Sequence, residues 1–207
     1  MRHSPAYIVT DPEVVKRLIR ENPWATFVSQ TADCLTASHY PVLLDESAEG
    51  IVIVSHFGRP DDETHQLGEQ EVLVIIQGPH GYISPSWYDG LGFIPTWNHA
   101  TVHLYGTPEL LSAEENYAVL SRLVDHFEQH VPAPCALSQD EAVARRVATG
   151  TTGIRLRVTR FDARLKLSQD KPEAVQTRVR AELAHGVDHP YRNEALAREM
   201  QLRTGAE

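Results

Sequence analysis

The sequence predicts a mainly β protein of the α+β class, an antiparallel β-barrel with peripheral helices and a helical C-terminal tail. Two observations favour this class. From residue 25 to residue 105, short apolar or alternating runs follow one another and are separated by turn-forming residues. No long helical pattern lies between these runs, whereas a parallel βαβ sheet needs a crossover helix between its strands.

Six of these runs have the length and alternation of strands. They are Ala25–Ser29, Leu35–Leu44, Ile51–Phe57, Val72–Gln77, Tyr82–Ser84 and Thr101–Tyr105. We expect turns between them at Asp45-Glu46-Ser47, Gly58-Arg59-Pro60, Gly78-Pro79-His80-Gly81 and Asp89-Gly90.

Helical signals flank the strands. Thr10-Asp11-Pro12-Glu13 has the spacing of a capping box and predicts a helix to about Asn22. Ser112-Ala113-Glu114-Glu115 is a second capping box. The apolar residues that follow it on one helix face are Tyr117, Leu120, Leu123, Val124 and Phe127. A weaker helix is expected from Ser138 to about Val147, and the tail from Pro172 onward has the pattern of two helices broken around Gly186–Pro190.

A late strand is expected after a turn at Gly150–Gly153. Residues 154–161 largely alternate between apolar and polar side chains, which predicts one buried and one solvent-facing side. The nearest sheet for this strand to join is the barrel. Because the sequence has no internal repeat or linker, we expect a single domain over residues 1–207, with 172–207 as a helical C-terminal extension.

The composition is typical of a soluble globular protein, with 42% hydrophobic and 23% charged residues among 207. No run of 18 apolar residues exists, so a membrane span is not expected. The first twenty residues lack the charged-then-apolar layout of an export signal. Cys34 and Cys135 are far apart and unpatterned, which favours a reduced cytoplasmic location.

The charge is distributed unevenly along the chain. Residues 1–150 carry 8 Lys and Arg against 20 Asp and Glu, and residues 151–207 carry 11 against 8. Between Glu21 and Ser121 the only Lys or Arg is Arg59. Because DNA binding draws much of its affinity from neutralising phosphates with basic side chains, we expect direct DNA binding to be absent.

Two segments are dense in aromatic residues, prolines and small hydroxyl residues. They are GPHGYISPSWY, from Gly78 to Tyr88, and IPTWNHATVHLYG, from Ile94 to Gly106. Such segments build rigid loops with flat apolar walls, suited to a planar heteroaromatic ligand or to a subunit contact. The alternative is that their Trp and Tyr residues fill the end of the barrel as part of its core.

These two segments resemble the signature stretches of the PaiB-type, FMN-binding negative transcriptional regulators. The resemblance continues in Ala37–Leu44 (ASHYPVLL), Ser55–Arg59 (SHFGR) and Leu165–Pro172 (LKLSQDKP), in the same order over roughly residues 1–175. It implies a split β-barrel like that of pyridoxine phosphate oxidase, forming a homodimer that binds FMN at the subunit interface.

The resemblance also implies a set of cofactor contacts. Ser38–Leu43 resembles the strand whose backbone lies along the flavin ring, and His56–Arg59 resembles the phosphate-binding stretch. The residues expected to contact the cofactor are Ser38, His39, Tyr40, Pro41, Ser55, His56, Arg59, Trp97 and Asn98.

Arg59 suits a phosphate on chemical grounds, because a guanidinium group donates a bidentate pair of hydrogen bonds to a dianion. The alternative is a surface charge that pairs with Asp61, Asp62 and Glu63. Family members commonly have a small residue, Asn and Pro after this arginine, whereas this chain has three carboxylates. These oppose a phosphate unless they point outward or are themselves paired. The family's WNY is Trp97-Asn98-His99 in this chain.

Other kinds of site have weaker support. Six histidines, at positions 39, 56, 65, 80, 99 and 103, show no zinc spacing, so no metal site is expected. Haem is the alternative planar cofactor, although no axial ligand stands out. Neither Cys34 nor the Ser84-Pro85-Ser86 stretch has the pattern of a nucleophile.

Three functions follow. The first is FMN binding by a dimer that takes part in negative transcriptional regulation through a protein partner or a small effector. The second is a flavin-dependent oxidoreductase acting on a small heteroaromatic substrate. The third is a split barrel that has lost its cofactor, which residues Pro60-Asp61-Asp62-Glu63 favour.

Overall fold

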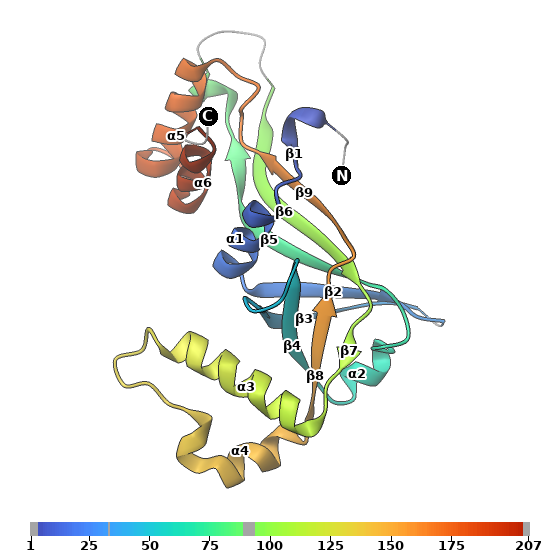
Figure 1. Ribbon diagram of the computed structural model, residues 1–207. Coiled ribbons are helices and arrows are strands. Elements are labelled where there is room, and N and C mark those ends of the chain that lie inside the picture. Colours follow the sequence, from blue (N-terminus) through green and yellow to red (C-terminus); the bar gives the residue numbers. More distant parts are fainter. Residues whose placement is uncertain (1–3, 33, 89–93, 205–207) are drawn as a thin grey trace. The chain divides into compact units, whose positions relative to one another are not determined.

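The structure is a computed structural model that describes residues 4–32, 34–88 and 94–204 (Figure 1). The chain forms two compact units. Unit 1 comprises Met1–Thr10, Gln77–Val102 and Asp162–Glu207, and unit 2 comprises Asp11–Ile76 and His103–Phe161. Three of the four boundaries between the units fall inside strands, namely β5 (Val72–Ile83), β6 (Thr96–Gly106) and β9 (Arg160–Lys166), and the fourth lies between Thr10 and Asp11. The prediction of a single domain stays a prediction.

Unit 2 contains most of the sheet. Its complete strands are β2 (Trp24–Gln30), β3 (Leu35–Leu44), β4 (Val52–Gly58), β7 (Glu109–Leu110) and β8 (Thr151–Arg157). With the first part of β5, they are ordered β5-β2-β3-β4-β8-β7. The pairings of β2 with β3 and β5, of β4 with β3 and β8, and of β7 with β8 are antiparallel. These pairings and the helices around them confirm the predicted antiparallel, mainly β class.

The core of unit 2 is aromatic at its centre. The ring centroids of Phe27 and Phe57 lie 4.9 Å apart, and both side chains are fully buried. Aliphatic side chains from the neighbouring strands complete this core, among them Ile53, Ile76 and Leu156. Burial of these side chains supplies the main driving force for folding of the unit.

Helix α1 (Pro12–Glu21) begins one residue later than its capping-box spacing suggests. The N-cap is Asp11, whose carboxylate accepts a hydrogen bond from the amide of Glu13 at 2.9 Å, and not Thr10. Asp is as good an N-cap as Thr, and Pro12 then takes the first helical position, where proline needs no hydrogen-bond donor.

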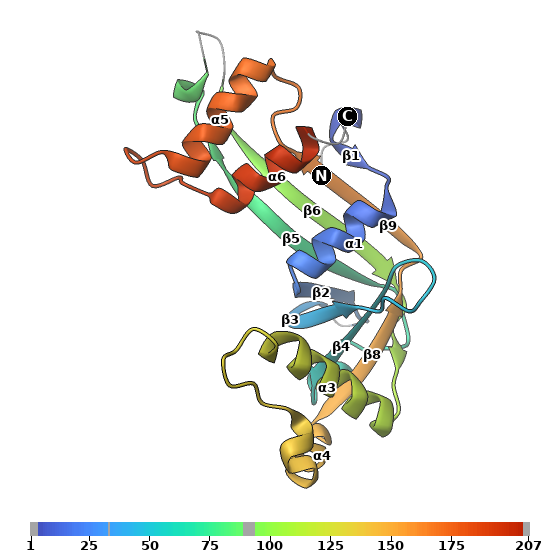
Figure 2. The ribbon, with the colours of Figure 1, turned by 60° about the vertical axis from the view of Figure 1, so that its left-hand side comes forward.

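Helix α3 (Ala113–Glu128) has the predicted capping box between Ser112 and Glu115. Figure 2 shows that it lies along β4 and β8. Its buried face, however, consists of Asn116, Val119 and Leu123. The predicted face is wrong at its C-terminal end, since Phe127 is 44% exposed.

The third predicted helix is a 3-10 turn, η3 (Leu137–Asp140), that continues into α4 (Glu141–Ala148). A one-turn helix, α2 (Asp61–Thr64), follows β4.

Unit 1 contains β1 (Ile8–Val9), most of β9, and parts of β6 and β5, in the order β1-β9-β6-β5. Two 3-10 turns, η1 (Pro5–Tyr7) and η2 (Pro85–Trp87), belong to it, and the tail forms α5 (Glu173–His185) and α6 (Glu194–Thr204) as predicted. Figures 1 and 2 both show α5 and α6 side by side. Trp87 and Tyr88 are buried in this unit, as the core interpretation of the aromatic residues predicted.

The predicted turn at Gly78–Gly81 is wrong, because β5 runs without interruption from Val72 to Ile83. A Cβ atom on Gly81 would lie 3.0 Å from Leu196 of α6, so this glycine gives a helix room to approach the strand. Asn193 also donates a hydrogen bond to the carbonyl of His80 at 3.0 Å. The expected rigid loop is therefore strand at residues 78–83, and the second aromatic segment is strand at 96–106. The Asp89-Gly90 turn lies outside the described residues.

The late strand is divided into two. β8 pairs with β4 and ends at Arg157, and β9 begins at Arg160 and pairs with β1. Between them, the amide of Val158 donates to the carbonyl of Ile51, and the amide of Thr159 donates to that of Tyr105. The chain thus changes partners at this point, which an alternating pattern does not reveal. Gly153, expected in a turn, lies inside β8.

Candidate functional site

Seven of the nine predicted cofactor contacts lie in unit 2, on β3 and on β4 with the turn after it. They are Ser38, His39, Tyr40, Pro41, Ser55, His56 and Arg59. Trp97 and Asn98 lie in unit 1 on β6.

Arg59 is held by its backbone at the end of β4. Its amide donates to the carbonyl of Gly150 at 3.0 Å, and the amide of Gly58 donates to the hydroxyl of Tyr40 at 3.2 Å. That hydroxyl in turn donates to Asp61 at 2.8 Å. Burial, and then the hydrogen bond to Asp61, raise the pKa of Tyr40, so the phenol stays a neutral donor. These bonds fix the position from which the Arg59 side chain extends.

The exposed Arg59 side chain lines a cavity of about 500 Å³. The cavity is formed by the turn after β4, the N-terminus of α3, the end of α4 and the start of β8. The other residues that line it are Leu111, Ala113, Glu114, Asn116, Tyr117, Arg145, Ala148, Thr149, Thr151, Thr152 and Gly153. A cavity of this volume accommodates a small-molecule ligand.

The three carboxylates after Arg59 do not neutralise it. Asp61 accepts from Tyr40, and Asp62 accepts from the hydroxyl of Thr152. Glu63 is exposed, and among the described residues none of the three forms an ion pair with Arg59. The surface-pair alternative for Arg59 therefore has no support in the geometry.

The donors in this cavity fit a phosphate. The hydroxyls of Thr149, Thr151 and Thr152 already donate to protein acceptors. The donors that remain include the guanidinium of Arg59 and the amides of Ala113 and Glu114, which lie in the first turn of α3 and have no partner inside the helix. A guanidinium and the positive end of a helix both favour an anion.

Arg145 lies in the same cavity but is already engaged. It pairs with Glu141 and Glu114 at 2.7 and 2.8 Å, and its guanidinium lies 4.2 Å from the ring centroid of Tyr117. Arg59 is therefore the cation left for a ligand, because the charge of Arg145 is largely balanced by two carboxylates.

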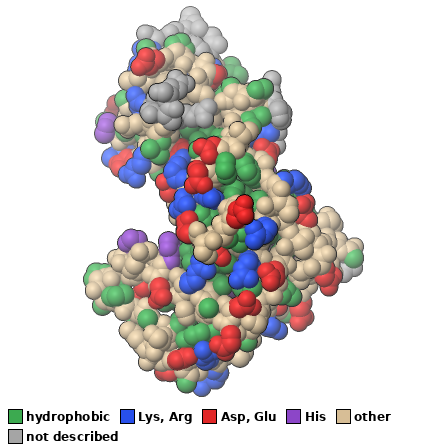
Figure 3. Space-filling view, in the orientation of Figure 1, with side chains coloured by type: hydrophobic (Ala, Val, Ile, Leu, Met, Phe, Trp, Pro, Cys, Tyr) green, Lys and Arg blue, Asp and Glu red, His purple; other side chains and the backbone are tan. Residues whose placement is uncertain are grey.

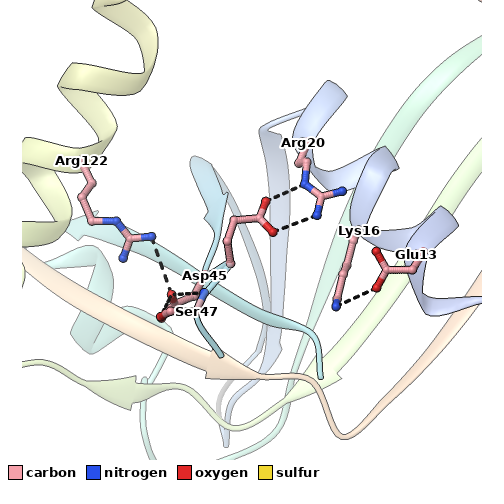
Figure 4. Close-up of polar contacts among 7 residues, drawn as sticks. Glu13, Lys16, Arg20, Asp45, Ser47 and Arg122 are labelled. Carbon is pink, nitrogen blue, oxygen red and sulfur yellow. Dashed lines mark hydrogen bonds and ion pairs between the residues drawn. The ribbon is translucent and has the colours of Figure 1, made fainter. Parts of the chain in front are cut away.

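A second cavity in unit 2, of about 390 Å³, differs from the Arg59 cavity in that its arginines are paired with carboxylates. Two arginines line this cavity, Arg20 and Arg122, and both are drawn in Figure 4. Arg20 forms two hydrogen bonds to Glu46, at 2.6 and 2.8 Å. Arg122 lies 3.9 Å from Asp45, which also accepts from Ser47. The bond from Arg20 lowers the pKa of Glu46. Because these cations are paired, this cavity lacks the free guanidinium of the Arg59 cavity.

Ser38 on β3 is part of a buried chain of hydrogen bonds. The Nε2 atom of His65 lies 3.0 Å from the Ser38 hydroxyl, and its Nδ1 atom lies 2.8 Å from the Ser29 hydroxyl. The Ser29 hydroxyl is fully buried, and among the described residues Nδ1 is the one atom within hydrogen-bond distance that can accept its proton. Ser29 therefore donates to Nδ1, and His65 donates from Nε2 to Ser38. This leaves the proton of the Ser38 hydroxyl free for a ligand.

His65 makes the stability of unit 2 depend on pH. Burial lowers its pKa below the ordinary value of 6.5, and nearby Asp61 opposes this only in part. The unfolded chain therefore takes up a proton below pH 6.5 that the folded chain does not. We expect stability to be complete above this pH and to fall below it, by up to about 1.4 kcal/mol per pH unit. Urea unfolding between pH 7.5 and 5.5 measures this slope.

The matched variant is His65→Gln, whose amide keeps one hydrogen bond but does not titrate. The variant is expected to lose stability at every pH and to show a smaller slope, with the remainder due to His56 and His99, whose pKa values burial also lowers. Equal slopes for the two proteins would show that His65 is not the titrating group.

The other predicted residues of unit 2 differ in exposure. His39 is exposed, and its ring stacks near Trp24 with the centroids 6.5 Å apart. Ser55 is fully buried and donates to the carbonyl of Pro41 at 2.7 Å, which ties β4 to β3. His56 lines a different, apolar cavity.

In unit 1, Trp97 and Asn98 face different environments. Trp97 is 56% exposed and stacks near His80, with the ring centroids 6.5 Å apart. Asn98 is fully buried and donates to Ser168 at 2.9 Å, which ties β6 to the segment after β9. The exposed Trp97 ring is thus accessible to a ligand, whereas the amide of Asn98 is used inside the protein.

Sequence reasoning did not identify His65, the N-terminus of α3 or Arg145 as part of this region. The capping box at Ser112 does mark a helix N-terminus, but only the folded chain shows that it lies beside Arg59.

Among the described residues no group of three or more His, Cys, Asp or Glu side chains is arranged to hold a metal ion. No helix in the described ranges is long and apolar enough to span a bilayer.

Comparisons with known proteins agree with this geometry. Residues 1–160 match the family described as "Putative FMN-binding domain". The chain is 31% identical over 175 residues to "Protease synthase and sporulation protein PAI 2" of Bacillus subtilis, covering 83% of this chain and 84% of that protein.

Two solved structures share the fold. The "FAD and Heme binding protein" of Mycobacterium smegmatis has a TM-score of 0.56 at 16% identity, covering 77% of this chain and 73% of that one. The "Flavocytochrome Anf3" of Azotobacter vinelandii has a TM-score of 0.58 at 14% identity, covering 80% and 72%. With the family match and the identity to PAI 2, these show that the chain belongs to the PaiB-type FMN-binding family and has its split-barrel fold.

Proposed function

We propose that this protein binds FMN as a homodimer and takes part in negative transcriptional regulation without reading DNA directly. The observation that carries the FMN proposal is the unpaired guanidinium of Arg59 in a cavity that also holds the N-terminus of α3. Arg59 and the first amides of α3 hold the phosphate. Ser38, with its free hydroxyl proton, and the β3 backbone from His39 to Pro41 hold the ring. Bound FMN would supply redox chemistry, and the protein would orient it.

The experiment is a titration of purified protein with FMN, followed by visible absorption and fluorescence. We expect FMN to bind with shifted flavin bands and with at least tenfold higher affinity than riboflavin, because riboflavin lacks the phosphate that Arg59 recognises. Absence of uptake would favour the alternative of a split barrel that has lost its cofactor.

The same protein is titrated with haemin, since one structural neighbour is described as binding both FAD and haem. A Soret band in place of flavin bands would make haem the planar cofactor. Reduction of bound FMN by an electron donor, with turnover, would support the second candidate function, an oxidoreductase for a small heteroaromatic substrate.

An open face of the sheet in unit 2 supports the homodimer. Trp24 and Leu35 are 63% and 67% exposed, and Ala37 and His39 beside them are exposed as well. These residues share one face of the β2–β3 pair, with Trp24 at one end and Leu35 at the other. Exposed apolar side chains on a sheet face are typical of subunit interfaces. The resemblance of β3 to the strand along the flavin ring supports an interface next to the cofactor.

Leu35→Asp is expected to dissociate the dimer, because the interface would bury an unpaired carboxylate. Sedimentation at micromolar concentration should show a monomer for this variant and a dimer for the wild type. The matched control is Leu110→Asp, which changes a leucine of similar exposure on β7. A monomeric wild type, or a dimer that persists in Leu35→Asp, would contradict the proposed interface.

The charge pattern supports regulation without direct DNA reading. Figure 3 shows Lys and Arg side chains interspersed with Asp and Glu on the face drawn. Arg20, Arg145, Arg155 and Arg160 each pair with a glutamate. Sequence-specific binding of duplex DNA with a steep salt dependence would overturn this part of the proposal.

The free thiols of Cys34 and Cys135 are consistent with the proposed cytoplasmic location.

A further inference from the structure

A third cavity in unit 2 has a different character from the Arg59 cavity. It has a volume of about 520 Å³ and lies between β4, α3, η3 and α4. Its walls are mainly apolar, and the side chains that form them include Leu120, Val124, Leu137, Val143 and Val147. Small-molecule sites have this combination of volume and apolar lining with few polar groups.

Two of the polar residues in the wall are satisfied by the protein. Asp140 accepts a hydrogen bond from the amide of Val143 at 3.2 Å and so caps α4. The hydroxyl of Thr151 donates to the carbonyl of Ala148 and accepts from Asn116. Gln139 is exposed at the rim. These residues therefore give the cavity little capacity to recognise a ligand.

His56 is different, because its side chain has no hydrogen-bond partner among the described residues. Its Nδ1 atom is buried without a partner. Its nearest aromatic neighbour is Tyr40, with ring centroids 6.0 Å apart. Nδ1 is closed to solvent, so the nitrogen that a molecule in the cavity can reach is Nε2, which is not buried and also has no hydrogen-bond partner among the described residues. An unpartnered nitrogen in an apolar wall is a position where a hydrogen-bonding group of a ligand is favoured.

The chemistry of His56 limits what this ligand can be. Burial lowers the pKa of the imidazole, which is therefore neutral and offers one donor and one acceptor. Val143 and Val147 are 40% and 66% exposed, so a ligand that covers them removes apolar surface from water. An anionic ligand would lose its hydration against these walls without finding a cation among the residues that line them, and Asp140, the carboxylate in the wall, is engaged as the N-cap of α4.

We propose that the His56 cavity binds a neutral, mainly apolar small molecule whose single hydroxyl or carbonyl group hydrogen-bonds to His56. The site is distinct from the Arg59 cavity, although Ala148 and Thr151 contribute to the walls of both. It takes a ligand without a phosphate, so it recognises a second molecule in addition to FMN.

The experiment uses 1-naphthol and naphthalene as probes on the full chain, with and without saturating FMN. We expect binding of 1-naphthol about tenfold tighter than that of naphthalene, the difference being one hydrogen bond to His56. His56→Leu should abolish this preference and retain naphthalene binding. Val147→Asp, at an exposed position that does not disturb the fold, should weaken both probes, and Val187→Asp on the exposed tail is its control.

Each contrary result overturns the proposal in a recognisable way. A 1-naphthol preference that survives in His56→Leu would place the hydrogen bond elsewhere. Displacement of the probe by FMN would make the cavity part of the flavin site. A Soret band on addition of haemin that is lost in His56→Leu would assign the cavity to haem. Failure of both probes to bind would show that the cavity does not take an apolar molecule.

Discussion

Replacing Arg59 by alanine is expected to weaken FMN binding by about 100-fold and to leave riboflavin binding nearly unchanged. Among the described residues that line its cavity, the guanidinium is the one strong cationic donor that no carboxylate engages, since Arg145 is paired with Glu141 and Glu114. Charge-assisted hydrogen bonds of this kind contribute more than neutral ones. Titration of both flavins into wild type and variant measures the effect.

The comparison variants separate charge from geometry. Arg59→Lys keeps the charge but loses the bidentate pair, so its FMN affinity should fall between those of wild type and Arg59→Ala. Arg146→Ala, which removes an exposed arginine of α4 that does not line the cavity, should have no effect. An equal loss of FMN and riboflavin affinity in Arg59→Ala would show that the variant disturbs the ring site or the fold instead of a phosphate contact.

Replacing Phe57 by alanine is expected to destabilise the protein by about 3–5 kcal/mol. The ring is fully buried at the centre of unit 2, with centroids 4.9 Å from Phe27, 4.3 Å from Tyr40 and 5.3 Å from His65. Its removal leaves a cavity beside the two side chains that hold Arg59 and Ser38 in place. Urea unfolding at pH 7.5 measures the change in unfolding free energy.

Phe127→Ala is the matched control, because this ring is 44% exposed on α3. We expect a loss of less than about 0.5 kcal/mol for it, the usual size of a surface substitution. If both variants lose the same stability, the aromatic group around Phe57 does not form the core of unit 2. FMN affinity should also fall in Phe57→Ala, since Tyr40 and His65 lose a packing surface.

Local sequence patterns predicted the elements whose formation depends on local chemistry. The capping box at Ser112 and Glu115 gave the start of α3, and the break around Gly186–Pro190 separated α5 from α6. β3 was predicted with its bounds, Leu35–Leu44. In each case hydrophobic periodicity, capping and turn residues all favour the same structure, so a short stretch of chain is sufficient evidence.

The two errors at glycine residues have one cause, which is a contact made with a distant part of the chain. Gly78 and Gly81 favour a turn locally, but β5 continues because α6 packs against Gly81. Gly153 lies inside β8, where a Cβ atom would come within 2.9 Å of the Cα atom of Asn116 on α3. A glycine that permits close approach of another element has the same local pattern as a glycine in a turn.

By itself, the sequence determined the mainly β class, the resemblance to the PaiB-type family and the isolation of Arg59 among acidic residues. Isolation along the chain did not show whether Arg59 is free, because Asp61, Asp62 and Glu63 are its neighbours in sequence. Only the tertiary structure decided this, since Tyr40 and Thr152 reach the two aspartates from β3 and β8. Each of these hydrogen bonds engages one oxygen of an aspartate and comes from a residue 21 or 90 positions away, so no local pattern contains them.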